Sequence, residues 1–134
     1  MKQKIRILIT GGSGFIGKEL INKLYKRNIQ TLSLSRKYKK KQNNIEWIKS
    51  SLKLSNKSFN KIRYFKPNIV VHLAWENIPD FSKKMCNINL QNTKFFFNKI
   101  LELKSIEKII ISGSCFEYKS KNGIKKEYNK INTS

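Results

Sequence analysis

The chain has 134 residues, 39% of them hydrophobic, which allows one domain with a buried core. It holds 29 Lys and Arg against 8 Asp and Glu, so its formal net charge is +21. No apolar run reaches the roughly 18 residues of a transmembrane helix, and the N-terminus lacks the apolar stretch of a signal peptide. Cys86 and Cys115 lack metal-ligand spacing. We therefore expect a cytoplasmic protein with ordinary thiols, no metal site and no membrane association.

The positive charge by itself is compatible with nucleic-acid binding. Lysines, however, are scattered along the whole chain, with one dense cluster at Arg36–Lys41. Aromatic residues do not alternate with basic ones, as a base-stacking surface requires. The composition therefore predicts weak, non-specific attraction to polyanions and no specific nucleic-acid function.

Residues Lys4–Thr10 form a nearly continuous apolar run, which is typical of a central parallel strand covered on both faces. A glycine-rich turn follows, and Phe15–Arg27 has the spacing of a helix. The turn fits both G-x-G-x-x-G and G-x-x-G-x-x-G through Gly11, Gly12, Gly14 and Gly17. This strand–turn–helix context indicates a dinucleotide site with the diphosphate at the helix N-terminus. The alternative is a glycine-rich turn without a ligand.

The second predicted strand, Gln30–Ser35, bears on the type of cofactor. In the dinucleotide fingerprint an acidic residue about 20 positions past the glycines binds the ribose hydroxyls. No acidic residue occurs between Glu19 and Glu46, and the strand ends in Ser35-Arg36. A hydroxyl and a guanidinium suit a 2′-phosphate, which favours NADP(H) over NAD(H). Alternatively, Arg36 is one more solvated cation or stacks on the adenine.

Further strands are predicted at 45–48, 68–73 and 106–112, and further helices at 54–65 and 82–103. His72, the single histidine, ends the fourth strand and has no evident catalytic partner, so we expect a structural role. The loop Trp75–Phe81 covers the cofactor or contacts substrate in this interpretation. The broad apolar surface of the helix at 82–103 indicates either a homodimer interface or burial within the monomer.

Strands that alternate with helices predict an α/β fold, a Rossmann-type doubly wound parallel sheet with strand order 3-2-1-4-5. We expect residues 1–118 to form this domain and the polar segment 119–134 to be a loop or disordered. The predicted apolar stripe of the first helix contains Phe15, Ile16, Leu20, Ile21 and Leu24.

Several of these segments together resemble the extended short-chain dehydrogenase/reductases, and more narrowly the NAD-dependent epimerase/dehydratase group that acts on nucleotide sugars. The segments are Thr10–Gly17, His72–Trp75, Asn89 and Ser112–Tyr118. The resemblance implies cofactor binding by Gly11, Gly14, Phe15, Ile16, Gly17, Arg36, Leu73 and Ala74. It also implies that Asn89 supports the active-site architecture and that Ser114 is the catalytic serine, which bonds the reacting substrate oxygen.

The sequence departs from this family in two places. Where the family has an Asp near the adenine, the chain has Ser50-Ser51-Leu52. The family's Tyr-x-x-x-Lys pair is absent, since no tyrosine has a lysine four positions later. We therefore expect the N-terminal part of an enzyme, truncated and inactive alone, that meets its nucleotide-sugar substrate only if a C-terminal part completes it. The alternative is a non-catalytic cofactor-binding module or a partner-dependent subunit.

Overall fold

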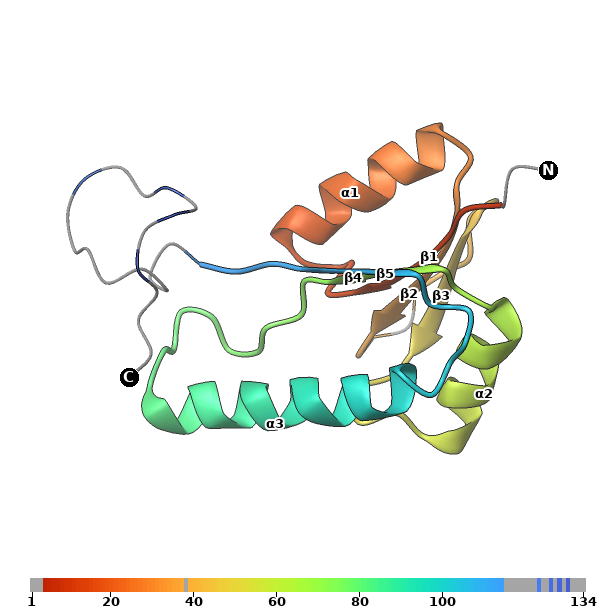
Figure 1. The fold of residues 1–134 in the computed structure, drawn as a ribbon. Helices are drawn as coiled ribbons and strands as arrows, with labels where there is room; N and C mark the ends of the chain where they lie inside the picture. The colour runs from red at the N-terminus through yellow and green to blue at the C-terminus, as the bar shows by residue number, and fades with distance from the viewer. Residues whose placement is uncertain are drawn as a thin grey trace.

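The computed structural model describes residues 4–37 and 39–114, together with residues 123, 126, 128 and 130. Strands and helices alternate along the described chain, except that β3 follows β2 without a helix between them (Figure 1). In order they are β1 (Arg6–Thr10), α1 (Phe15–Lys26), β2 (Gln30–Ser35), β3 (Ile45–Lys49), α2 (Asn56–Phe65), β4 (Ile69–His72), α3 (Lys83–Ile100) and β5 (Lys108–Ile111). Every predicted element is present close to its predicted bounds.

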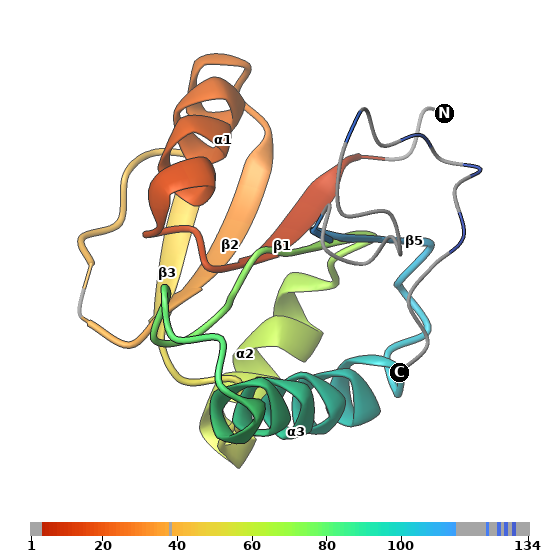
Figure 2. The same ribbon diagram turned by 90° about the vertical axis from the view of Figure 1, so that its left-hand side faces the viewer.

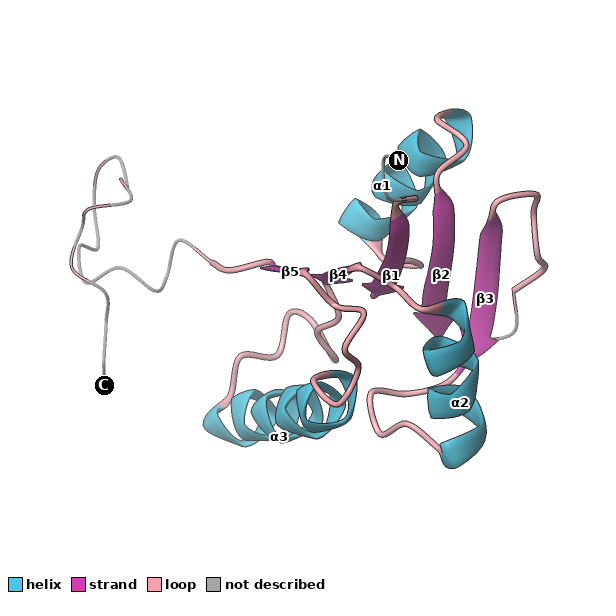
Figure 3. Ribbon diagram, turned by 45° about the vertical axis from the view of Figure 1, so that its right-hand side comes forward, coloured by secondary structure: helices cyan, strands magenta, loops and turns pink. Residues whose placement is uncertain are grey.

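The strands form one five-stranded sheet in the order β3-β2-β1-β4-β5. All four neighbouring pairs are parallel, as the strand arrows show for β1, β2 and β3 in Figure 3. The predicted fold class and strand order are therefore confirmed. The chain runs outward from β1 to β3 and then returns to the other side of β1 with β4. This reversal leaves a crevice at the carboxyl ends of β1 and β4, where such sheets bind ligands.

Helices cover both faces of the sheet, with α1 on one face and α2 and α3 on the other (Figure 2). On the α1 face, Ile21 and Leu24 pack with buried residues of β1, β3 and β4. On the other face, Ile62 of α2 and Phe96 and Ile100 of α3 pack around Leu8 of β1. The central strand therefore has apolar side chains buried on both faces, as its continuous apolar run predicts.

One expectation about apolar residues is wrong. Phe15 and Ile16 do not lie in the buried stripe of α1 but are 93% and 60% exposed. The β5 strand is nearly continuously apolar in sequence, yet all four of its residues are exposed. Ile111 is the extreme case at 57% exposure, because β5 is an edge strand that helices cover incompletely.

The three consecutive phenylalanines of α3 separate into different environments. Phe96 is fully buried, Phe97 is partly buried against the same core, and Phe95 is 47% exposed. Ile88, predicted on the apolar side of this helix, is 37% exposed. Burial within the monomer thus accounts for part of the broad apolar surface of α3, while Phe95 and Ile88 stay exposed to solvent.

None of the helices within the described ranges combines the length and the apolar character needed to cross a membrane. The segment 119–134, predicted as a polar tail, lies outside the described residues except for four isolated positions.

Candidate functional site

A hollow of about 420 Å³ opens at the carboxyl ends of β1, β2 and β4. Its walls come from the turn after β1, the end of β2, the segment after β3 and the loop after β4. They comprise residues 10–11, 13–17, 34–36, 50–52, 73–76 and 78. All the residues predicted to bind cofactor are among them, so the fold brings Gly11, Gly14, Phe15, Ile16, Gly17, Arg36, Leu73 and Ala74 together.

The glycines of the turn have different structural reasons. Gly11 has a φ of +74°, and a Cβ there would meet the backbone nitrogen of Ala74 at 2.7 Å. A Cβ at Gly17 would collide with the Gly11 carbonyl, so this glycine allows α1 to start close to the turn. A Cβ at Gly14 would have a single neighbour within 4 Å, the Gly11 oxygen at 3.3 Å. Packing alone therefore does not require Gly14, which lines the hollow.

The N-terminus of α1 differs from those of the other helices. Serine side chains cap α2 and α3: Ser55 accepts from the Ser58 N–H, and Ser82 from the Met85 N–H, each at 3.2 Å. The N-cap of α1 is Gly14, and no side chain caps this helix. Its first N–H groups and positive dipole end are therefore available to an anion beside the hollow.

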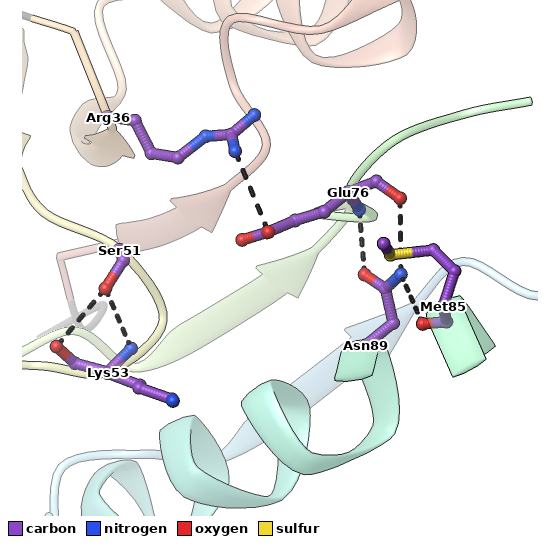
Figure 4. Close-up of polar contacts among 6 residues, drawn as sticks. All are labelled: Arg36, Ser51, Lys53, Glu76, Met85 and Asn89. Atoms are coloured by element: carbon purple, nitrogen blue, oxygen red, sulfur yellow. Dashed lines mark hydrogen bonds and ion pairs between the residues drawn. The ribbon is translucent and has the colours of Figure 1, made fainter. Parts of the chain in front are cut away.

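The charged groups of the hollow sit on opposite walls. Arg36 follows β2 and Glu76 follows β4, and the guanidinium Nη1 lies 3.7 Å from the carboxylate Oε2 (Figure 4). The preceding Ser35 hydroxyl accepts a hydrogen bond from the Lys37 N–H at 3.2 Å. Sequence reasoning placed Glu76 in a covering loop and missed its pairing with Arg36, because only the strand order brings these residues together.

Asn89 fixes the backbone that carries Glu76. Its side-chain oxygen accepts from the Glu76 N–H at 2.7 Å, and its amide donates to the Glu76 carbonyl at 3.2 Å. The amide also donates to the Met85 carbonyl at 3.0 Å within α3 (Figure 4). Asn89 is 2% exposed, so this buried side chain joins the loop after β4 to the helix.

The wall formed by Ser50, Ser51 and Leu52 carries no charge. The Ser51 hydroxyl accepts from the Lys53 N–H at 3.2 Å and donates to the Lys53 carbonyl at 3.4 Å, so it stabilises its own turn. Leu52 is buried against the core. The departure from an Asp in this segment leaves an apolar and hydroxyl-lined surface.

His72 lies behind the hollow and is 4% exposed. Its Nδ1 is 2.8 Å from the Thr10 hydroxyl, and its Nε2 is 3.2 Å from the Thr93 hydroxyl. The Thr10 hydroxyl also accepts from the Ala74 N–H at 3.3 Å, which ties β1 to the loop after β4. Burial lowers the pKa of His72, since removal from water disfavours the imidazolium. These contacts support the predicted structural role.

The serines after β5 lie apart from the hollow. The Ser112 hydroxyl donates to the His72 carbonyl at 3.4 Å. Ser114, predicted to be catalytic, is exposed beyond β5 and does not line the hollow. Tyr118, which ends the segment that carries the resemblance, and the second thiol, Cys115, fall outside the described residues. Among the residues described, no three His, Cys, Asp or Glu side chains gather where they could hold a metal ion.

Comparisons with known proteins agree with this geometry. A sequence profile of the NAD dependent epimerase/dehydratase family matches residues 7–134. The dTDP-4-dehydro-6-deoxyglucose reductase of Escherichia coli is 33% identical over 125 residues, which are 84% of this chain and 39% of the reductase.

Solved structures of similar fold include UDP-glucose 4-epimerase from Thermotoga maritima, with UDP-glucose, and MoeE5, with UDP-glucuronic acid and NAD. The match to the first has a TM-score of 0.71 at 20% identity and covers 90% of this chain and 41% of the epimerase chain. The match to the second has a TM-score of 0.77 at 19% identity and covers 95% of this chain and 42% of the MoeE5 chain. The chain thus spans about two-fifths of the length of these relatives.

Proposed function

Because this chain belongs to the NAD dependent epimerase/dehydratase family, we propose that its hollow binds NAD(H) or NADP(H). The observation that carries this proposal is the start of α1. It is the one described helix without a serine cap, and it begins in a glycine turn at the edge of the hollow. Free N–H groups at such a helix start suit a diphosphate.

The residues around the hollow fit a dinucleotide. The glycine turn and the exposed Phe15 and Ile16 would hold the diphosphate and its ribose, and Leu73 and Ala74 would form the opposite wall. Gly14 supports this fit, because it lines the hollow and a Cβ there would meet only one protein atom within 4 Å, the Gly11 oxygen at 3.3 Å. A bound nicotinamide dinucleotide supplies the hydride acceptor or donor, while this chain's residues bind and orient it.

Arg36 favours NADP(H) over NAD(H) in this proposal. Its guanidinium is 67% exposed at the rim of the hollow and follows β2, where the fingerprint recognises the adenosine ribose. A planar guanidinium binds a phosphate through paired hydrogen bonds. The nearby Ser35 hydroxyl adds a polar group without negative charge.

The chain would serve as the cofactor-binding portion of an epimerase, dehydratase or reductase acting on nucleotide sugars in the cytoplasm. Relatives whose names include such substrates support this. In this proposal Ser114, which lies beyond the hollow, would contact the reacting oxygen of a bound substrate. These residues alone are not expected to turn over substrate, because they contain no Tyr-x-x-x-Lys pair. Such a lysine lowers the pKa of the tyrosine that acts as base.

A second candidate is a cofactor-binding subunit that depends on a partner chain. The exposed faces of β5 favour it, since Ile109, Ile110 and Ile111 are 36%, 45% and 57% exposed on an edge strand. A homodimer through the helix at 82–103 would instead use Phe95 and Ile88. Both arrangements leave the dinucleotide site in the same place.

Titrations with NADPH and NADH, followed by tryptophan emission, test the function. Trp75 lines the hollow and provides the signal. We expect saturable binding of both cofactors, tighter for NADPH, and a loss of that preference in Arg36→Ala. Arg63→Ala, an exposed arginine of α2 that does not line the hollow, is the matched control. Equal affinity of the wild type for the two cofactors would contradict the NADP(H) preference. If the wild type bound neither cofactor, the proposed function would be overturned.

A further inference from the structure

Arg36 and Glu76 meet across the rim of the hollow. They follow β2 and β4, the two strands that flank β1, so their side chains approach from opposite sides of the glycine turn. The guanidinium Nη1 and the carboxylate Oε2 are 3.7 Å apart, with side-chain exposures of 67% and 26% (Figure 4). A ligand that reaches for the Arg36 guanidinium therefore meets a carboxylate already beside it.

The position of Glu76 is built into the fold. Asn89 holds both its N–H and its carbonyl, at 2.7 and 3.2 Å, and is itself buried. The Glu76 side chain thus extends from a fixed backbone, whereas Arg36 follows a strand end and is mostly exposed. Of the two partners, Arg36 is the one with more freedom to turn toward a ligand.

Arg36 and Glu76 supply the charged side chains of the rim. Among the described residues that line the hollow, Arg36 and Glu76 are the only charged ones. The chain has 29 basic and only 8 acidic residues, so its composition alone does not lead one to expect a carboxylate beside Arg36. Its charge offsets that of Arg36 and repels an incoming phosphate.

The carboxylate also supplies what the end of β2 lacks. No acidic residue occurs between Glu19 and Glu46, where the fingerprint places the group that accepts hydrogen bonds from the ribose hydroxyls. Glu76 brings a carboxylate to the same rim from the neighbouring strand β4. A free 2′-hydroxyl can donate to this carboxylate, and a 2′-phosphate cannot.

We propose that Glu76 is a specificity-determining residue that competes with a 2′-phosphate for Arg36 and accepts a hydrogen bond from an unphosphorylated ribose. This inference rests on the proposed dinucleotide site and deepens it. Arg36 attracts the 2′-phosphate, Glu76 opposes it, and the pair together keeps the site open to both cofactors. The wild-type preference for NADPH is therefore small.

Glu76→Gln tests this directly, because glutamine keeps the side-chain length and the backbone bonds to Asn89 while removing the charge. We expect NADPH to bind about fivefold tighter and NADH to bind no tighter, so that the ratio of dissociation constants shifts by at least about fivefold. In an Arg36→Ala background the same substitution should change the NADPH affinity much less, since the two side chains act together.

Glu102→Gln is the matched control, because it removes one exposed carboxylate that pairs with Lys99 on α3, away from the hollow. It should leave the cofactor ratio unchanged. If wild type binds both dinucleotides but Glu76→Gln leaves their ratio as it was, this inference is overturned and the proposed function stands. If the folded wild type binds neither dinucleotide, both are overturned.

Discussion

The glycines of the turn after β1 show how one residue type serves two purposes. Gly11 and Gly17 are required by neighbouring backbone, since a Cβ at either position would overlap the chain. Gly14 is less constrained, since a Cβ there would meet only the Gly11 oxygen, at 3.3 Å, and it lines the hollow. The glycine pattern was recognisable from the sequence, but which glycine serves folding and which serves a ligand depends on how close β1, α1 and the loop after β4 come together.

Substitution of Gly17 by Ala should destabilise the fold. The added methyl group would press on the carbonyl of Gly11, and relief of that overlap requires α1 to move away from β1. We expect a loss of about 1–3 kcal/mol in the free energy of unfolding, measured by urea denaturation. Gly14→Ala is the control and should lose well under 1 kcal/mol, so equal losses in the two variants would contradict this assignment.

His72 should make stability depend on pH. Burial holds its pKa in the folded chain below the usual value of about 6.5, so the unfolded chain binds this proton first as pH falls. The stabilising contribution is complete above pH ~6.5 and declines as pH falls from there toward the folded pKa.

Urea denaturation at a series of pH values checks this, with His72→Phe as the variant that lacks the titrating group. The variant should flatten the decline just below pH ~6.5. The pKa of Asp80 is also lowered, through hydrogen bonds from Ser82, but its effect falls in a more acidic range. An unchanged slope in His72→Phe would show that another group causes the decline.

At the scale of elements, the spacing of apolar residues and the positions of glycine and proline were sufficient to predict the strands and helices. The apolar runs of β1 and β4, the glycine turn, and Pro67 after α2 mark boundaries that the structure reproduces. The exposure of Phe15 and Ile16 was not predictable from periodicity, because both residues line the hollow at the start of α1 instead of packing into the core. The pairing of Arg36 with Glu76 was also not predictable from the sequence, because the two residues follow strands that lie on opposite sides of β1.

Asn89 connects α3 to the loop after β4, so its removal should lower both the stability of the fold and the affinity for the dinucleotide. Asn89→Ala leaves the Glu76 N–H and carbonyl without their buried partner, so we expect a loss of about 2–3 kcal/mol in unfolding free energy. The loosened loop should also weaken dinucleotide binding several-fold. Asn87→Ala, an exposed asparagine on the same helix, is the control and should have little effect on either quantity.

The whole molecule combines strong positive charge with exposed apolar surface. The +21 charge keeps copies apart at low ionic strength, whereas the exposed isoleucines of β5 favour contact. The sequence predicted the parallel sheet and its order, but it did not show that β5 would be left uncovered. That depends on which helices reach the sheet edge.

Association should therefore increase with salt and depend on β5. Sedimentation at about 0.05 M and 0.5 M NaCl should show a rise in average mass, because salt screens the repulsion between copies. Ile110→Lys, on the edge strand, should suppress this rise, and Phe95→Lys, on α3, should not. The reverse pattern would place the contact on the helix at 82–103 instead.

The central claim is that a nicotinamide dinucleotide binds at the glycine turn, and one titration tests it most directly. NADPH is added to wild type and to Gly14→Val, with circular dichroism to verify that both are folded. We predict saturable binding to the wild type and at least a tenfold weaker interaction with the variant, because the new side chain would occupy part of the hollow, where its Cβ meets only the Gly11 oxygen. Equal binding to the two folded proteins, or none to the folded wild type, would contradict the claim.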